Sequence, residues 1–316
     1  MKTTLQSLQE SIANAVDIID QSQLVGNDLL LQQYAKTTTV SLDFTNANSL
    51  LDKCEQVIDS YKKSKPVIRV IHHLACSGGT LFSKCLAAMP NTFLLSEVHP
   101  YSDLHLDRGA SVYLPTDIIS LSRYADIPDV EQLAGDIFTS NIIKTSKHVS
   151  SYAGSLILRD HTHFDFCSGA RVALKPAVFS LLESHFEIRN LVTIRNPIDS
   201  YLSLEKNNWK HFDPFSFEEY CRRFIEMTKF YSKSDIYRYE DLVKEPSLTM
   251  QKMCVSLDLP YSDCFLDIFE LFRVTGNSGR SSPVITEMPR GELSPEFLLE
   301  VQASSSFQRI IKKFDY

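Results

Sequence analysis

The chain has no long hydrophobic run. Its apolar stretches, such as VIRVI at 67–71, stop far short of the ~20 consecutive apolar residues that a membrane-spanning helix requires. The first residues carry Gln, Glu and Asp where a secretory signal would be continuously apolar. We therefore expect no membrane span and a cytoplasmic location.

Positive charge is in deficit, because 32 Lys and Arg stand against 39 Asp and Glu, for a net charge of -7. This balance disfavours a nucleic-acid partner, but it allows a small anionic ligand in a local basic pocket. Closely spaced cysteine pairs are missing as well, because the seven cysteines are scattered along the sequence and include no C-x-x-C motif. We therefore expect buried thiols and neither a metal site nor a redox pair.

What the sequence does contain is a regular alternation of short apolar runs and longer amphipathic stretches. Strands are predicted at 67–74, 93–98, 155–161, 188–195 and 235–239. Helices are predicted at 79–89, 116–124, 130–147, 197–208, 216–232, 246–257, 261–272 and 295–314. Strands that alternate with helices predict an α/β fold, in which a central parallel sheet is flanked by helices.

The amino-terminal part has a different pattern. Residues 5–19 and 50–61 each place apolar side chains at steps of three and four, which predicts two amphipathic helices. The charged segment KKSKP at 62–66 then breaks the pattern, because a proline disfavours helix at the residue before it. We predict a helical extension over 1–65, which could mediate oligomerisation, and an α/β domain over 66–316.

A turn of small residues follows the first predicted strand. Ser77, Gly78, Gly79 and Thr80 let the backbone turn tightly into a helix, whose free N–H groups and dipole can bind an anion. The motif G-x-x-x-x-G-K-[ST] is absent, which disfavours a standard ATPase or GTPase. Close packing alone would also account for small residues at such a turn.

A second constellation lies in LVTIRNPIDSYLSL at 191–204. Arg195 ends a predicted strand, and Ser203 lies in the helix that follows it. A guanidinium at the carboxyl edge of a sheet and a hydroxyl on the adjacent helix can hold one phosphate from two sides. A structural salt bridge and a surface serine are the alternative interpretation.

Three segments, CSGGTLFSKCLAAMPN, VTIRNPIDSYLSL and YRYEDLVKEP, together resemble the sulfotransferases that use 3'-phosphoadenosine 5'-phosphosulfate (PAPS), which have a P-loop fold. The resemblance is local, and it extends to both the cytosolic and the tyrosylprotein members. It implies that Arg195 and Ser203 hold the 3'-phosphate and that Tyr239 lies near the adenine. It also implies a 5'-phosphosulfate loop made of Cys76, Ser77, Gly78, Gly79, Thr80 and Leu81.

Cys76 departs from the family pattern, because members usually have Lys or Arg directly before the loop serine. A neutral thiol cannot stabilise the charge that develops on the bridging oxygen, so we expect another cation, Lys84 or Arg159, to do so. A thiolate nucleophile is the other interpretation of this cysteine, and nothing else in the sequence favours it. Arg280 lies in a glycine-containing segment similar to the family's Arg-Lys-Gly loop, which closes over the 3'-phosphate.

The resemblance leaves two candidates for the catalytic base. Glu97 occupies the place of the tyrosylprotein-sulfotransferase glutamate, and His161 can be aligned with the histidine of the cytosolic enzymes. Either a carboxylate or an imidazole can accept a proton from an acceptor hydroxyl. We lean towards Glu97, because its distance from the loop serine matches well.

The implied activity is transfer of a sulfuryl group from PAPS to a hydroxyl or amine, which leaves adenosine 3',5'-bisphosphate. The acceptor, whether a small molecule, a saccharide or a peptide, is not named by any side chain. A nucleotide kinase-like P-loop enzyme and a non-catalytic protein that retains the PAPS pocket remain the alternatives. Cys76 is the residue that keeps the second alternative open.

Overall fold

The computed structural model describes residues 65–104, 116–275, 284–287, 290 and 292–316. Within them, five parallel strands form one sheet in the order β2-β3-β1-β4-β5. The strands are β1 (Val67–His73), β2 (Thr92–Val98), β3 (Ser155–Asp160), β4 (Glu187–Ile194) and β5 (Ile236–Arg238). The predicted central parallel sheet is therefore confirmed.

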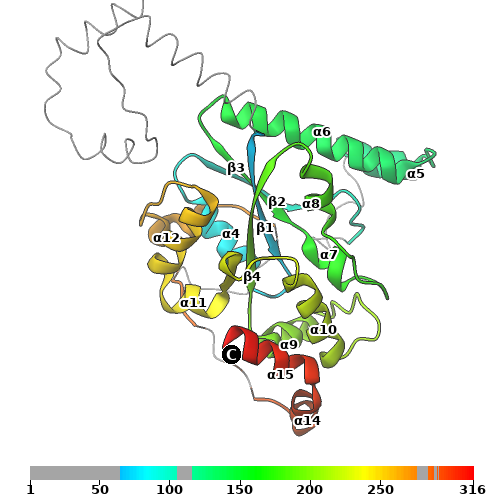
Figure 1. The fold of residues 1–316 in the computed structure, drawn as a ribbon, viewed down its shortest axis with the longest axis vertical. Helices are drawn as coiled ribbons and strands as arrows, with labels where there is room; N and C mark the ends of the chain where they lie inside the picture. The colour runs from blue at the N-terminus through cyan, green and yellow to red at the C-terminus, as the bar shows by residue number, and fades with distance from the viewer. Residues whose placement is uncertain (1–64, 105–115, 276–283, 288–289, 291) are drawn as a thin grey trace, which may run out of the picture. The chain divides into compact units, whose positions relative to one another are not determined.

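Helices cover both faces of this sheet (Figure 1). One face carries α4 (Gly79–Ala87), α11 (Tyr239–Lys244), α12 (Pro246–Leu257) and α13 (Phe265–Ile268). The other face carries α6 (Val130–Ser150), α7 (Thr162–Cys167), α8 (Ala177–Leu182) and α10 (Phe217–Thr228). The remaining helices are α5 (Ile118–Tyr124), α9 (Pro197–Lys206), α14 (Pro295–Ala303) and α15 (Ser305–Phe314). No helix among the described residues is long and apolar enough to cross a membrane.

Side chains of the central strand β1 alternate between the two faces, as the period of a strand requires. Ile71 packs with α4 and α12, whereas Ile68 and Val70 pack with α6 and α8. All three are fully buried. Because β1 pairs with β3 on one side and β4 on the other, the loop that follows it lies in the middle of the carboxyl edge. Ligands of open parallel sheets bind at this edge.

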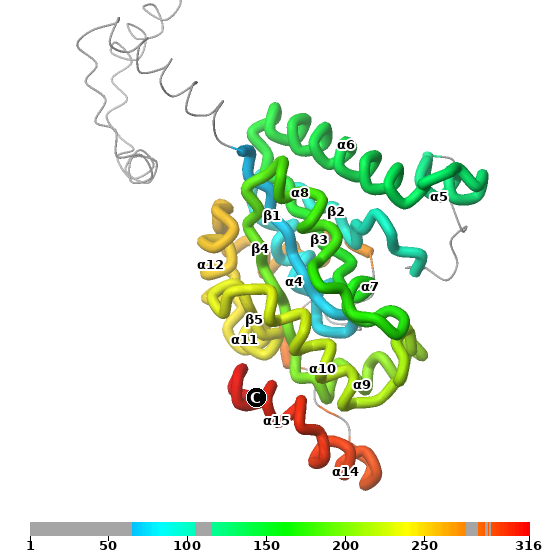
Figure 2. Tube along the Cα trace, turned by 45° about the vertical axis from the view of Figure 1, so that its right-hand side comes forward, coloured from blue at the N-terminus to red at the C-terminus, as the bar shows by residue number. Residues whose placement is uncertain are grey.

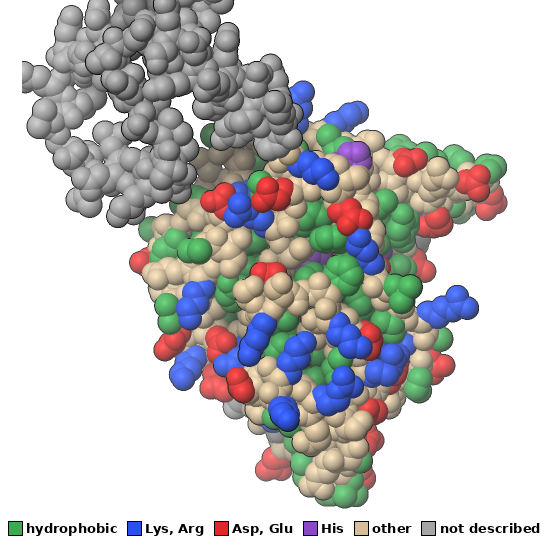
Figure 3. All heavy atoms as spheres, viewed as in Figure 1, with side chains coloured by type: hydrophobic (Ala, Val, Ile, Leu, Met, Phe, Trp, Pro, Cys, Tyr) green, Lys and Arg blue, Asp and Glu red, His purple; other side chains and the backbone are tan. Residues whose placement is uncertain are grey.

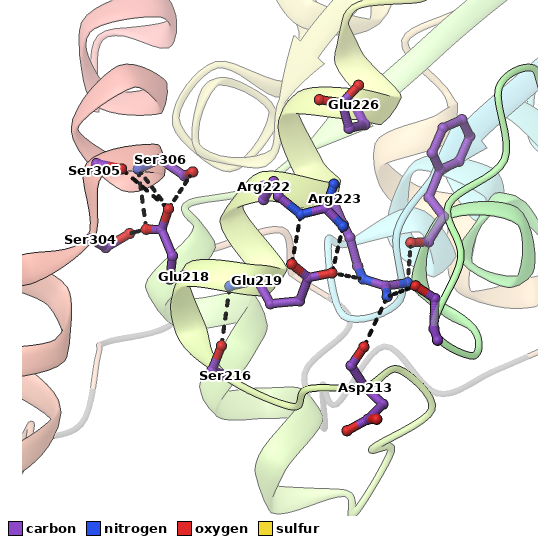
Figure 4. A network of polar contacts seen from close by, with 12 residues as sticks. Asp213, Ser216, Glu218, Glu219, Arg222, Arg223, Glu226, Ser304, Ser305 and Ser306 are labelled. Carbon is purple, nitrogen blue, oxygen red and sulfur yellow. Dashed lines mark hydrogen bonds and ion pairs between the residues drawn. The ribbon is translucent and has the colours of Figure 1, made fainter.

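The prediction of one helix over 295–314 is wrong. The helix is interrupted at Ser304, which has extended backbone angles. The Ser304 hydroxyl caps α15 by accepting from Phe307 N. Glu218 of α10 accepts hydrogen bonds from Ser304, Ser305 and Ser306 (Figure 4). A carboxylate at this end of a helix satisfies its free N–H groups and its dipole. Figure 2 shows α14 and α15 beyond the carboxyl edge of the sheet.

Three further differences concern short elements. The helix expected over 261–272 is only α13 followed by a 3-10 turn, Phe269–Leu271. Helices α7 and α8 were not predicted, and Tyr239 begins α11 rather than ending a strand. The predicted extension over 1–65 falls, except for Lys65, outside the described residues, so this prediction and the domain boundary stay untested.

A buried arginine links α10 to two loops at the same end of the sheet. Arg223 is fully buried, pairs with Glu219 one turn earlier, and donates to the carbonyls of Phe166 and Gly169 (Figure 4). A buried guanidinium requires such partners for its N–H groups. Arg223 thus fixes the segments that follow α7 and precede α10.

Candidate functional site

The carboxyl ends of the strands bring together most of the residues that the sequence marks out. The loop after β1 holds Cys76 and Ser77, and the end of β2 holds Glu97. Arg159 is in β3, and Arg195 directly follows β4. Segments far apart in the chain therefore meet at one edge, beside the amino terminus of α4.

The loop between β1 and α4 makes a tight turn into the helix. Gly78 caps α4 with φ 86° and ψ 5°, and its carbonyl accepts from Leu81 N at 2.9 Å. Cys76 also has a positive φ, of 64°, which is uncommon for a residue with a side chain. Ser77 is buried and its hydroxyl donates to Leu74 O at 2.7 Å. The backbone N–H of Ser77 also donates to Leu74 O, at 3.3 Å, so both groups of Ser77 secure the turn.

Tyr239 and Arg195 form one wall beside this turn. The guanidinium carbon of Arg195 lies 4.8 Å from the centre of the Tyr239 ring, in cation–π geometry. The same ring lies so close to Gly78 that a Cβ built there would be 2.4 Å from Tyr239 Cδ2. Arg195 Nη1 lies 3.5 Å from the carbonyl oxygen of Cys76, and its Nε is buried without a partner among the described residues. The structure therefore places Arg195 and Tyr239 next to the loop.

Ser203 lies two turns into α9, on the helix that Arg195 precedes. It is half-buried and its hydroxyl donates to Asp199 O at 2.8 Å. Asp199 in turn accepts two hydrogen bonds from Arg290, at 2.7 and 2.9 Å. Arg290 belongs to the same carboxyl-terminal segment as Arg280, which lies outside the described residues.

Cys76 is partly buried and its thiol is kept neutral. Burial raises the pKa of the thiol to about 11, and hydrogen bonding from Asn207 and the charge of Arg195 offset this only in part. A thiol with such a pKa is a poor nucleophile near neutral pH, since the thiolate is the reactive form. The burial of Cys76 therefore disfavours the thiolate interpretation.

Arg159 reaches the loop from β3. It is buried, and its contacts use both edges of the guanidinium. Its partners are His73 Nε2 at 2.8 Å, Thr275 O at 2.8 Å, Ser96 Oγ at 3.2 Å, Thr80 Oγ1 at 3.3 Å and Glu97 Oε1 at 2.5 Å. These five contacts match the five N–H donors of arginine. Arg159 is thus held in one orientation between the first turn of α4 and Glu97.

Glu97 sits at an irregular end of β2. Its φ is 57°, and the register with β3 shifts between Leu95 and Val98. Burial raises the pKa of the Glu97 carboxyl to about 7, with Arg159 lowering it and Asp160 raising it. One carboxylate oxygen pairs with Arg159, while the other is buried without a partner among the described residues. A carboxyl with these properties suits proton transfer near neutral pH.

His161 is a weaker base in this environment. It precedes α7, and Ser102 Oγ lies 3.1 Å from its Nδ1. Burial lowers the pKa of His161 to about 4, and the neighbouring His99 lowers it further. Lys84 lies farther along α4 and pairs with Glu270 at 2.5 Å. Of the two cations predicted to compensate for Cys76, Arg159 is the one that contacts the loop helix at Thr80.

His99, Asp160 and Asp165 place potential metal-ligand atoms within 4.8 Å of one another. However, His99 Nδ1 accepts the backbone N–H of Tyr101 at 3.1 Å, which assigns the ring proton to Nε2. This proton points to Asp165 Oδ1 at 3.2 Å. Because a metal ligand needs a free lone pair on the nitrogen, this tautomer does not fit a metal.

The sequence interpretation missed several residues around Arg159. His73, Ser96 and Thr275 contact it, and none of them was singled out. His73 and Ser96 do carry a signal: they are polar residues near the carboxyl ends of two strands. The period of β1 places His73 on the side of α4, since Ile71 packs there.

Lys and Arg side chains gather over α9, α10 and α15 although the chain is acidic (Figure 3). Burial lowers the pKa of Lys313, and the neighbouring Lys229, Arg309 and Lys233 lower it further. These four residues therefore form a local group of positive charges.

Comparisons with known proteins place sulfotransferases among the similar structures. The sulfotransferase domain from the curacin biosynthetic pathway is 17% identical, over 80% of this chain and 99% of that chain, with a TM-score of 0.48. The sulfotransferase domain of the Synechococcus PCC 7002 olefin synthase is 17% identical, over 80% and 96%, with a TM-score of 0.45.

The mouse sulfotransferase SULT7A1 complexed with PAP is 10% identical, over 82% of this chain and 94% of that chain, with a TM-score of 0.39. No family model and no curated protein matches the sequence. At these identities and TM-scores, what this chain binds has to be inferred from its own residues.

Proposed function

We propose that this protein is a PAPS-dependent sulfotransferase. The observation that carries the proposal is the position of Arg195, which follows β4, stacks on Tyr239 and reaches the carbonyl of Cys76 in the loop before α4. A guanidinium beside a helix amino terminus and over an aromatic ring suits a ligand that combines phosphates with a purine. The order and spacing of the three sequence motifs support the same donor.

The proposed reaction is an in-line transfer. The acceptor hydroxyl or amine attacks the sulfur of PAPS, and its proton passes to Glu97. The bond between sulfur and the bridging oxygen breaks, and its electron pair leaves with adenosine 3',5'-bisphosphate. Backbone N–H groups of the loop helix and the guanidinium of Arg159 would stabilise the charge on the transferred group. Glu97 suits the base better than His161, because its pKa lies closer to neutrality.

Ligand-induced thermal stabilisation tests the donor. Adenosine 3',5'-bisphosphate should raise the melting temperature, whereas ATP with magnesium should not. Stabilisation by ATP with magnesium alone would favour the kinase-like alternative and overturn the proposal. If the bisphosphate binds but labelled PAPS gives no transfer to any of a broad panel of hydroxyl and amine acceptors, the non-catalytic alternative is preferred.

Arg195→Ala tests the proposed 3'-phosphate site. Loss of a charge-assisted contact should weaken bisphosphate binding by about 2–4 kcal/mol, or roughly 30-fold to 1000-fold in Kd. Arg195→Lys is the matched control, since it keeps the charge but not the planar fork and should lose less. An unchanged affinity in Arg195→Ala would remove this residue from the site.

A further inference from the structure

One buried histidine links the loop helix to the ion pair of Arg159 and Glu97. His73 is the last residue of β1, and only 3% of its surface is exposed. The ring lies under Gly79, so that a Cβ at that glycine would be 2.7 Å from the ring. The closest approach of His73 Nε2 to Glu97 Oε1 is 3.7 Å.

The two ring nitrogens of His73 have different partners. Nδ1 lies 3.0 Å from Leu74 O, and a carbonyl can only accept, so Nδ1 carries the proton. Nε2 lies 2.8 Å from Arg159 Nε, which can only donate, so Nε2 offers its lone pair. Both contacts require the neutral ring with its proton on Nδ1. Burial lowers the pKa of His73 well below its ordinary value, and the charge of Arg159 acts in the same direction.

We propose that His73 is a positioning residue, whose Nε2 holds the guanidinium of Arg159 so that this guanidinium faces Thr80 and Glu97 at once. Among the described residues, every other partner of Arg159 binds a terminal nitrogen, and His73 alone binds Nε. A guanidinium that is held only through its two terminal nitrogens can still tilt relative to the aliphatic part of its own side chain. The Nε contact removes this freedom and keeps positive charge beside both the loop and the carboxylate. The proposal rests on the proposed function, because it concerns residues of that donor site.

The groups around Glu97 determine how its pKa would change if the contact between His73 and Arg159 were lost. Arg159 and Asp160 of β3 act on its charge with opposite signs, and the neutral ring of His73 faces it from β1. Thr275, which contacts Arg159 and Ser96, adds no charge. If Arg159 moves away, the carboxylate loses its cation and its pKa rises. Protonation of Glu97 also favours a bound anion, so bisphosphate affinity should fall as the pH rises through this pKa.

Two amide variants of His73 isolate the contact between Nε2 and Arg159. His73→Gln places an acceptor near the position of Nε2, whereas His73→Asn replaces only the Nδ1 side. Both remove the ring from Gly79, so they share the packing loss. The measurement is isothermal titration of adenosine 3',5'-bisphosphate from pH 5.5 to 8.5. His148→Asn, in helix α6 and away from the site, is the control: it shows whether replacing any histidine changes the affinity profile.

The midpoint of the affinity profile should move upward by about 1 pH unit in His73→Asn. His73→Gln should lie closer to the native midpoint, and Glu97→Gln should leave only the pH dependence of the ligand's own phosphates, whose second pKa is about 6 and which all variants share. Identical profiles for the Asn and Gln variants would overturn the proposal. Absence of bisphosphate binding to the native protein would instead overturn the proposed function.

Nitrogen-15 NMR of the native protein tests the positioning role without a variant and without a ligand. The imidazole shifts of His73 should report a proton on Nδ1 and none on Nε2 throughout pH 6 to 8. A charged ring, or a proton on Nε2, would be incompatible with the contact to Arg159. This result decides the proposal even if both variants fail to fold.

Discussion

Gly78→Ala is the sharpest perturbation of the loop before α4. Gly78 has φ 86°, and a Cβ added there would lie 2.4 Å from Cδ2 and 3.2 Å from Cε2 of Tyr239. The ring cannot move aside freely, because Tyr239 is buried and Arg195 stacks on it. The new methyl group therefore meets both a backbone strain and a steric overlap.

The two effects have separate magnitudes. A residue with a Cβ in the left-handed region costs about 1–2 kcal/mol, and overpacking of a filled site costs about 1–3 kcal/mol. Gly78→Ala should thus lower the free energy of unfolding by about 2–5 kcal/mol. Natural domains are stable by only ~5–15 kcal/mol, so the variant should fold but melt early.

Gly169→Ala is the matched control. Gly169 has φ 62°, and no atom lies within 4 Å of a Cβ built on it. It should therefore cost only the backbone strain of about 1–2 kcal/mol. Urea unfolding of the two variants, with Tyr239→Ala in a double-mutant cycle, separates strain from overlap. Equal losses for Gly78→Ala and Gly169→Ala would refute the contact between Gly78 and Tyr239.

Three further predictions concern single titrating groups. Burial disfavours the charged form of Glu218, but hydrogen bonds from the serines at the start of α15 outweigh it and lower its pKa. Glu218→Gln should therefore cost up to about 1 kcal/mol at pH 7, and the difference in urea unfolding should vanish as the pH falls below the folded pKa. Cys76 should alkylate more slowly with iodoacetamide at pH 8 than the exposed Cys264, as read by mass spectrometry; a faster reaction would contradict its raised pKa. With an acceptor found by labelled PAPS, Glu97→Gln should lower turnover by about 10²–10⁴-fold and His161→Ala by less, and the reverse order would make His161 the base.

The fold class could be predicted from the sequence because its strands carry a strong local signal. Three of the four residues of LVTI at 191–194 are apolar and Thr193 is β-branched, a pattern typical of a buried parallel strand. The break at Ser304 could not be predicted in this way, because the helical period continues across it. The break depends on Glu218, which is 86 residues away in the chain and hydrogen-bonds Ser304.

The candidate site could be predicted only where one segment carries its own signal. Gly78, Gly79 and Arg195 belong to local motifs, and the structure brings them to one edge. The partners of Arg159 come from separate strands and from the segment near Thr275, so no spacing in the sequence links them. Sequence reasoning could name Arg159 as a cation but could not show that Glu97 already neutralises part of its charge.

The pairing of Arg159 with Glu97 bears on why the loop can carry Cys76. A lysine at position 76 would place a third cation near Arg195 and Arg159, and each would repel the others in a partly buried site without a ligand. Here Arg195 contacts the loop carbonyl at 3.5 Å, and Arg159 is balanced by Glu97 at 2.5 Å. Under the proposed function, an incoming phosphosulfate would draw on Arg159 and leave Glu97 less stabilised as an anion, which makes it a better proton acceptor. The cation and the base would then be coupled through one ion pair, a coupling that a fixed lysine in the loop would not provide.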